Sequence, residues 1–589
     1  MLKQIHKIFE KAYGFVIART NMSIVFFFIY ALFLIAPFLY SGPNVPAGND
    51  YHWHHLIVHN IGLAFDGGQI PPRVMPDVMG FGFGYGTGIF YSQLPHFVTW
   101  VISRLPLFNV HSAITAVFFL CYFFSGYTFY KMMRYMGKTE SAAVIGGLLF
   151  MSLPYHIMDV FYNNALSQMF CSILLPLVLM GFLKLVREQK IMILVLSFSA
   201  IVLSHNITAL YTFLFLVAGC LVYARSFMNR RVFVAGIKAA VLVLLLTAFF
   251  TVPIMEHVFF NAHGDGYQAF ALGDNLRNFA VGKALHVAQL FYWPFGHAGF
   301  ANHDALRNGS PVFIGAHLIL LFVVAVLWPS SRKNLRANTP FILAALALVF
   351  ATTIYFPWRS VPYIFLNVQY PARLLSGAGF FICIVAADVF SRMSARETRL
   401  SMIVIALVGM FYTTRIASIL PIRPKFTEGD VSLKGNRFYG NYNSVAGGEY
   451  LPKKVRWNNQ AYLNWPKTPY TLWKRVTLSG FRREKNGRFS FDIDSDVRDE
   501  IGFPIFYYMG YEIKFTPVAG GPTRVLDYYE NHSGFVTTGN PGKGSVKVRY
   551  KGTAADRTAT IISFLTLFLI ICYAVVPARM RRKIFSRPT

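Results

Sequence analysis

Long apolar runs separated by short polar connections form most of the chain. A helix of ~20 apolar residues is long enough to cross the hydrocarbon core of a bilayer. We predict twelve such spans, at residues 22–41, 109–132, 141–158, 165–186, 191–205, 207–225, 232–254, 311–330, 340–357, 374–391, 400–419 and 558–578. The pattern therefore predicts an α-helical polytopic membrane protein.

The basic residues predict how these spans are oriented. Lys and Arg cluster in alternate connections, for example at Arg230 and Arg231 and again at Arg332 and Lys333. Because cytoplasmic loops carry the excess of positive charge, both termini are expected on the cytoplasmic side of the cell membrane. A further apolar stretch, 88–105, would invert every later span if it crossed the bilayer. We therefore expect it to be a re-entrant or interfacial segment on the outer side.

Three large segments are predicted to lie outside the membrane, at 42–108, 255–310 and 420–556. Parts of the third alternate apolar and polar residues with a period of two, and Gly-Gly and Pro-Gly pairs separate them. This pattern predicts a mainly β domain before the last span. The expected organisation is a transmembrane domain at 1–419, the β domain at 420–556, and a last helix with a basic cytoplasmic tail at 557–589.

Composition agrees with a membrane protein and limits the chemistry. Of 589 residues, 55% are hydrophobic and 14% are charged, with 55 Lys and Arg against 26 Asp and Glu. The five cysteines all fall in predicted spans, so neither a disulfide framework nor a zinc-binding spacing is expected. The basic excess suits anionic membrane lipids or an anionic polymer or phosphate-bearing substrate. Nucleic acid is not an expected partner.

Polar residues are predicted to meet at the outer ends of the spans. Asp50 stands out because carboxylates are scarce in this chain. The other candidates at this level are His52, His54, His55, Arg73, Asp159, Asn163, Asn164, His205, Asn206, Glu256, Gln369, Tyr370 and Arg373. The alternative interpretation is that polar residues collect at any membrane exit. The glycine-rich run 80–86 has two readings as well, a flexible loop against the membrane or a phosphate cradle, and it lacks the ending of a phosphate-binding motif.

Several short motifs resemble one bacterial membrane-protein family. They are Asp50 after the first span, Gln69-Ile70-Pro71-Pro72-Arg73, Phe90-Tyr91-Ser92-Gln93-Leu94-Pro95, Leu153-Pro154-Tyr155, Leu203-Ser204-His205-Asn206, Val252-Pro253-Ile254-Met255-Glu256 and Gln369-Tyr370-Pro371-Ala372-Arg373. Together they resemble the YfhO-like proteins and the 6-pyruvoyl-tetrahydropterin-synthase-related membrane domain, which are similar to GT-C glycosyltransferases. One departure is the stretch 163–168, where this chain lacks both charges of the family pattern.

The resemblance implies an enzyme that transfers a sugar from a polyprenyl-phosphate donor to an extracytoplasmic cell-envelope acceptor. Asp50 would take the proton of the acceptor hydroxyl, and the anomeric configuration would invert. Arg373 and Arg73 would stabilise the leaving lipid phosphate, because guanidinium is planar and permanently charged. A divalent cation, Mg or Mn, would share that work through Asp50 and His54 if the enzyme uses one. The acceptor would be a polysaccharide, a lipid glycan or a teichoic-acid-like anionic polymer.

In this interpretation the remaining outer-level residues bind substrate: His52, His54, His55, His205, Asn206, Glu256, Gln369 and Tyr370. Two other classes of function stay open at this point. A transporter or flippase for a lipid-linked glycan would carry polar residues through the membrane. A non-enzymatic cell-envelope assembly factor would present its basic β domain to wall polymers.

Overall fold

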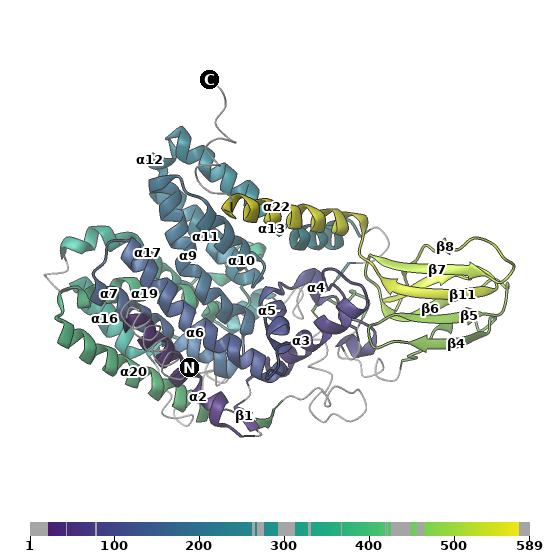
Figure 1. Ribbon diagram of the computed structural model, residues 1–589, viewed down its shortest axis with the longest axis horizontal. Helices are drawn as coiled ribbons and strands as arrows, with labels where there is room; N and C mark the ends of the chain where they lie inside the picture. Colours follow the sequence, from purple (N-terminus) through teal and green to yellow (C-terminus); the bar gives the residue numbers. More distant parts are fainter. Residues whose placement is uncertain are drawn as a thin grey trace, which may run out of the picture.

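A computed structural model describes residues 22–42, 44–46, 48–76, 79–261, 266–267, 276–291, 313–327, 332–366, 368–418, 420, 422–425, 449–455 and 465–575. Predictions about the N-terminal residues, the basic tail and most of 420–448 lie outside these ranges. The described chain is mainly helical, with a small β-sheet region near the C-terminus (Figure 1).

Eight helical segments of the described chain are long and apolar enough to cross a membrane. They are α2 (Met22–Tyr40), α6 (Val110–Tyr135), the consecutive α7 (Glu140–Met151), α8 (Pro154–Met158) and η2 (Asp159–Asn163), α9 (Leu166–Glu188), α13 (Arg230–Phe259), the consecutive η6 (Pro371–Arg373), α19 (Leu374–Ala387) and η7 (Asp388–Arg392), α20 (Ala395–Ser418) and α22 (Ala554–Val575). Each of these segments coincides with a predicted span.

Four predicted spans fall on shorter apolar helices. These are α10 (Met192–Val202), α11 (Asn206–Val222), α16 (Ala316–Leu327) and the part Ala337–Thr352 of α17 (Arg332–Thr352). The 11 residues of α10 reach only ~16 Å along a helix axis, about half of the hydrocarbon thickness. The predicted number of twelve spans is therefore not confirmed. The stretch 88–105 contains α5 (Leu94–Ser103), which is also too short to cross, in line with an interfacial or re-entrant segment.

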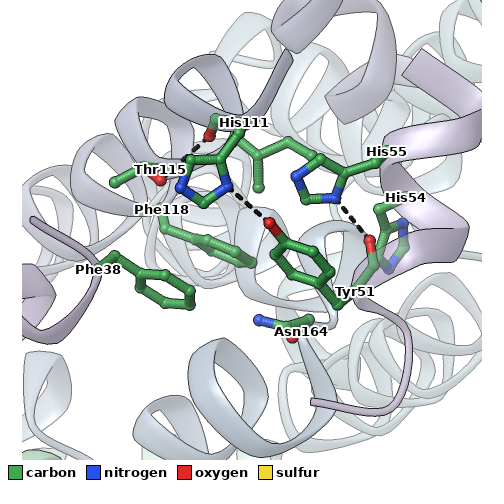
Figure 2. Close-up of a pocket in the computed structure, with 9 residues that line it drawn as sticks. Phe38, Tyr51, His54, His55, His111, Thr115, Phe118 and Asn164 are labelled. Carbon is green, nitrogen blue, oxygen red and sulfur yellow. Dashed lines mark hydrogen bonds between the residues drawn. The ribbon is translucent and has the colours of Figure 1, made fainter. Parts of the chain in front are cut away.

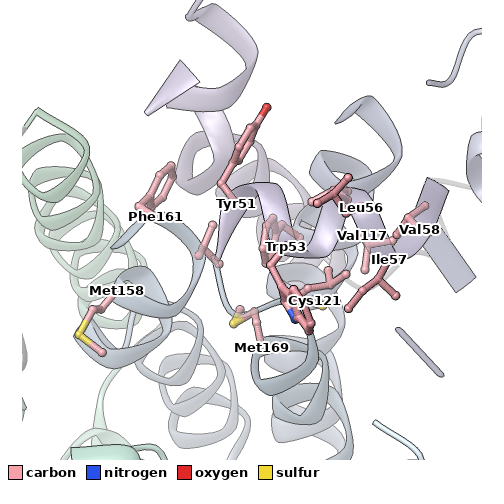
Figure 3. Packing of buried hydrophobic residues seen from close by; sticks show 14 of the residues in the cluster. Tyr51, Trp53, Leu56, Ile57, Val58, Val117, Cys121, Met158, Phe161 and Met169 are labelled. Carbon is pink, nitrogen blue, oxygen red and sulfur yellow. The ribbon is translucent and has the colours of Figure 1, made fainter. Parts of the chain in front are cut away.

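The first outer segment packs into the helical body through α3 (Tyr51–Asp66). Most of this helix is buried. Figure 3 shows its apolar residues against those of α6, η2 and neighbouring helices; the labelled members are Tyr51, Trp53, Leu56, Ile57, Val58, Val117, Cys121, Met158, Phe161 and Met169. Burial of this much apolar surface fixes α3 relative to the membrane helices. The residue that precedes it, Asp50, therefore has a defined position.

The β-sheet region lies within the predicted outer segment 420–556 and confirms its β character. One sheet has the order β3-β6-β10-β9 and the other β4-β5-β11-β7-β8, and neighbouring strands in both sheets are antiparallel. The strands are β3 (Tyr470–Thr471), β4 (Leu478–Arg483), β5 (Phe489–Ile493), β6 (Glu500–Phe506), β7 (Tyr511–Pro517), β8 (Arg524–Val525), β9 (Tyr529–Glu530), β10 (Phe535–Gly539) and β11 (Gly544–Tyr550). A separate pair, β1 (Asn44–Pro46) with β2 (Ile422–Pro424), joins the starts of two outer segments.

The two sheets pack against each other, and the glycine-rich run 80–86 contacts both of them. Phe503 of the four-stranded sheet contacts Phe491 of the five-stranded sheet, with ring centroids 5.7 Å apart. On the other side, Phe506 contacts Phe83 at 5.4 Å and donates its N–H to the Phe83 carbonyl oxygen at 3.0 Å. The run also reaches the five-stranded sheet, where a Cβ at Gly84 would lie 3.5 Å from the Tyr511 hydroxyl oxygen of β7.

This run is a buried docking surface, so neither interpretation offered from the sequence describes it. Gly80 and Gly84 have left-handed φ values of 62° and 87°, which glycine adopts at little cost. A Cβ at Gly86 would lie 2.5 Å from the Tyr508 ring, so glycine is needed for this close approach. The aromatic residues between the glycines are buried, because the β region covers them.

Candidate active site

Asp50 is held in place by the backbone of the turn 159–164, which is distant in the sequence. Its N–H donates to the carbonyl oxygen of Asn163, and that of Asn49 donates to Tyr162, both at 2.9 Å. A Cβ at Gly48 would lie 2.1 Å from the Tyr162 carbonyl oxygen, so glycine is required there. The Asp50 side chain does not cap α3, and the residue keeps an accessible surface although surrounding protein removes part of its hydration. Its carboxylate is therefore available to a ligand.

The turn that holds Asp50 also carries a buried carboxylate, Asp159. This residue begins η2, a π-helical turn of a type that is frequent at functional sites. Asn163 donates to Asp159 Oδ1 at 3.1 Å, whereas Oδ2 is buried and has no hydrogen-bond partner within the described ranges. Gln168 donates to the Tyr155 hydroxyl at 3.0 Å. In the stretch that departs from the family pattern, neutral side chains thus hold the turn.

Arg373 presents an open edge of its guanidinium. Its Nη1 donates to Gln369 Oε1 at 2.6 Å and to the Val368 carbonyl oxygen at 3.3 Å. The Tyr370 ring lies 4.9 Å from its Cζ. Nε and Nη2 donate to no protein atom in the part of the chain that the structure describes. These two nitrogens form the edge that binds a carboxylate or phosphate through two parallel hydrogen bonds.

Three carboxylates interact electrostatically with Arg373 without touching it. They are Asp50, Asp159 and Glu449, from three distant parts of the sequence. Among the described residues, no N···O contact of 4.0 Å or less joins any of them to Arg373. We call Arg373 and these three acids the Arg373 group. None of the three carboxylates directly contacts the open edge of the guanidinium.

The protein environment changes the pKa values of two of these acids. Loss of hydration raises the pKa of Asp50 to about 6, and the Arg373 charge acts in the opposite direction. Burial also raises the pKa of Glu449 to about 7; Arg373 lowers it, and the charge on Asp50 raises it further. Because the two carboxyl groups interact, they titrate as a coupled pair, and both pKa values lie above the usual range for a carboxylic acid.

Glu449 is a member of the site that the sequence did not reveal. It belongs to the C-terminal outer segment, and no periodicity or motif singles it out there. The neighbouring Tyr450 stacks on Phe90 with centroids 5.7 Å apart, and its carbonyl oxygen accepts from Tyr508 at 3.0 Å. The Tyr85 hydroxyl donates to the Glu449 carbonyl oxygen. Contacts with the first outer segment and the β region thus position this acid.

Two of the quoted motifs meet beside the Arg373 group. Asn206 donates to the Phe90 carbonyl oxygen at 2.9 Å, and Ser92 donates to that of Val202 at 2.7 Å. His205 caps the N-terminus of α11 and lies within electrostatic range of Arg373. The polar turn between α10 and α11 thus binds the segment 90–94.

The three predicted histidines of α3 are buried rather than turned toward a substrate. His54 Nδ1 lies 2.7 Å from His96 Nε2, and burial lowers the pKa of both imidazoles. Figure 2 shows His55 beside His111 in a small cavity, where the Tyr51 hydroxyl binds His111 Nδ1 at 2.9 Å. His52 is buried on the same helix.

These positions do not provide a metal site. Within the described ranges, no group of three or more His, Cys, Asp or Glu residues is placed to hold a metal ion. His54, the predicted partner of Asp50 in such a site, is engaged with His96 instead.

Arg73 and Glu256 lie apart from the Arg373 group, at the start of α22. Arg73 Nε and Nη2 bind the two Asp556 carboxylate oxygens at 3.2 and 2.6 Å, and Nη1 donates to the Gly88 carbonyl oxygen at 3.1 Å. Glu256 accepts a hydrogen bond from the Thr553 hydroxyl at 2.5 Å. The guanidinium edge that Arg73 would offer to a phosphate is thus occupied by the protein.

Comparison with known proteins leaves the function of this site open. No family model matches the chain. A protein of Lactococcus lactis subsp. cremoris, described as uncharacterized, is 23% identical over 611 residues, which cover 95% of this chain and 96% of that protein. The similarity extends over nearly the full length of both chains. The fold and the site thus define a mainly helical protein with an acid–arginine group beside a β region, and its described residues include eight segments that could span a membrane.

Proposed function

We propose that the chain is an integral membrane glycosyltransferase of the GT-C type that uses a polyprenyl-phosphate sugar. The observation that carries this proposal is the open guanidinium edge of Arg373 beside the accessible carboxylate of Asp50. An enzyme of this class needs both a proton acceptor and a permanent cation for a phosphate. The distribution of basic residues supports an extracytoplasmic site with both termini inside the cell.

In the proposed reaction the acceptor hydroxyl oxygen attacks the anomeric carbon of the donor. The bond between that carbon and the phosphate oxygen breaks, and the lipid phosphate leaves with the electron pair. Asp50 takes the hydroxyl proton, and a single displacement inverts the anomeric configuration. A pKa of about 6 leaves the Asp50 carboxylate ionised near neutral pH, yet still basic enough to accept a proton.

Arg373 stabilises the negative charge that develops on the leaving phosphate. Its Nε and Nη2 bind two phosphate oxygens, while Gln369 and Val368 hold Nη1 and so fix the orientation of the fork. Glu449 in its protonated form donates a hydrogen bond to the substrate. As a buried acid in the turn below Asp50, Asp159 helps to orient Arg373 electrostatically.

The test is a transfer assay with purified protein in proteoliposomes and a panel of polyprenyl-phosphate sugars. Wild type is compared with Asp50→Asn and with Asp66→Asn, which changes an exposed aspartate at the far end of the same helix. Sugar transfer that is lost in Asp50→Asn and kept in Asp66→Asn supports the proposal. Movement of an intact lipid-linked glycan across the bilayer, without a new glycosidic bond, would instead identify a flippase. If the wild type shows neither activity while both variants support normal envelope assembly, a non-enzymatic role follows.

A further inference from the structure

The outer face of the five-stranded sheet is polar and exposed. Along β11 the residues alternate, so Val546 and Val548 are buried while Lys547 and Arg549 are exposed. The buried face packs against the four-stranded sheet through contacts such as that between Phe491 and Phe503. The exposed face points away from the four-stranded sheet, and it carries a regular arrangement of charge.

The strand register places three cations in one row across four strands. Arg482 of β4 lies opposite Ser490 of β5, Ser490 lies opposite Lys547 of β11, and Lys547 lies opposite Lys514 of β7. Directly paired residues of an antiparallel sheet point to the same side. With neighbouring strands ~4.8 Å apart, this basic row is about 15 Å long. Lys547 and Lys514 face each other directly, which is unfavourable unless a counter-charge lies between them.

The carboxylates on this face do not supply enough counter-charge. Asp492 is exposed in the neighbouring row, opposite Ser545. Glu512 is contacted by Arg549 at 2.6 Å, by Lys551 at 2.9 Å and by Lys514 at 3.8 Å, so one acid serves three cations. The other two cations of the row form no ion pair among the described residues. The face therefore keeps an excess of positive charge.

Small hydroxylated residues lie between the long basic side chains. Ser490 is part of the basic row, and Ser545 lies opposite Thr516 in the neighbouring row. Short side chains leave space above the strands for an extended ligand. Their hydroxyl groups can also donate hydrogen bonds to phosphate or sugar oxygens.

We propose that the basic row binds a linear polyanion, a polymer with repeating phosphate or carboxylate groups that lies across the strands. A polymer matches a row ~15 Å long better than one small anion does, because successive charges meet successive cations. Anionic lipid headgroups have the same chemistry. The polymer is favoured because the row crosses four strands in one line, which suits a chain of linked charges better than separate lipid headgroups. This inference does not depend on the glycosyl transfer proposed above.

Binding can be measured without turnover, with the full chain in nanodiscs of zwitterionic lipid. The probe is fluorescently labelled inorganic polyphosphate, followed by anisotropy, and neutral dextran is the control polymer. The test variant is Lys514→Gln with Lys547→Gln. The matched control is Lys474→Gln with Arg498→Gln, which removes the same charge from exposed loops of the same region. A third variant, Ser490→Asp, places a negative charge inside the row without removing a cation.

We expect the wild type to bind polyphosphate in a salt-dependent way and to ignore dextran. The row variant should bind polyphosphate about tenfold more weakly than wild type. The control double variant should bind within about twofold of wild type. Ser490→Asp should bind more weakly than wild type, at an unchanged melting temperature. Absence of polyphosphate binding by the wild type would overturn the proposal, as would an equal loss in the two double variants. The same variants are also tested on vesicles of anionic lipid. If the row variant lost binding to these vesicles but still bound polyphosphate, the row would be assigned to lipid headgroups instead.

Discussion

Arg73 and Arg373 look alike in the sequence but occupy very different environments. Each follows a proline closely at a predicted outer membrane boundary. Arg73 is only 2% exposed, and both carboxylate oxygens of Asp556 occupy its Nε and Nη2. The same two nitrogens of Arg373 have no protein partner in the described chain, although three carboxylates act on it from a distance.

This difference separates a structural from a functional arginine. A buried charge with a bidentate partner contributes to stability mainly because removing either partner leaves the other uncompensated. A guanidinium with an open, oriented edge offers little to folding and much to a ligand. The comparison predicts that substitutions around Arg73 change stability, whereas substitutions around Arg373 change activity.

The largest effect is expected for Asp50→Asn in the Arg373 group. The amide keeps the shape of the side chain but cannot accept the hydroxyl proton. Transfer should fall by about 10²–10⁴-fold, the range for loss of a general base, at unchanged thermal stability. Single-turnover transfer measures the first quantity, and the melting temperature in detergent measures the second. Transfer within a few-fold of wild type would show that another acid, Asp159 or Glu449, is the base.

Breaking the ion pair between Arg73 and Asp556 is predicted to lower the stability of the protein rather than its activity. Arg73→Met leaves the Asp556 carboxylate buried without its partner and should cost about 3–5 kcal/mol. Thermal unfolding and the amount of protein in membranes report this loss. The control is Arg73→Met combined with Asp556→Leu, which removes both charges and should recover much of the stability. A singly substituted protein as stable as wild type would contradict a structural role.

Lysine substitutions compare the two arginines directly. Arg373→Lys keeps the charge and removes the fork, so we expect a fall in kcat/KM of about 10–100-fold at normal stability. Arg373→Ala should lose more. Arg73→Lys, the matched control, should lower the melting temperature while each folded molecule keeps its activity. The comparison fails if Arg373→Lys transfers sugar from the native lipid donor at the wild-type rate.

The sequence identified those parts of the site that lie next to periodic segments. Asp50 and Arg373 were found because each borders an apolar run, and the run lengths are visible in the sequence. The β region was predicted from its alternating residues, which its strands reproduce. Local pattern thus located these elements but not their partners.

Tertiary contacts determined what the sequence could not show. Glu449 reaches the site because Tyr450, Tyr85 and Tyr508 hold its backbone, and none of these contacts has a local signature. Arg73 was predicted to bind phosphate. Its partner in the structure, Asp556, lies 483 residues away, so no local pattern could reveal the ion pair. The α3 histidines looked accessible from their position at a membrane exit, yet apolar packing of the helix buries them.

The smallest effect concerns the order in which the two acids of the Arg373 group titrate. Below about pH 6 Asp50 is protonated and cannot act as the base, so kcat/KM should rise as the pH increases through that value. Above about pH 7 Glu449 also ionises. A second negative charge then lies near the donor phosphate and should weaken its binding. The profile is therefore expected to be bell-shaped, with both limbs belonging to the coupled pair of acids.

Glu449→Gln is the variant that tests this order. The amide stays neutral at every pH, so the alkaline limb should disappear while the acid limb, which reports Asp50, stays near pH 6. At neutral pH the change should be only a few-fold, rising to about tenfold near pH 8 because the wild type is then mostly ionised at Glu449. Glu484→Gln, at an exposed glutamate after β4, should leave both limbs in place. If the alkaline limb persisted in Glu449→Gln, Glu449 would have no role in the reaction. Asp50 and Asp159 would then be the acids that act with Arg373.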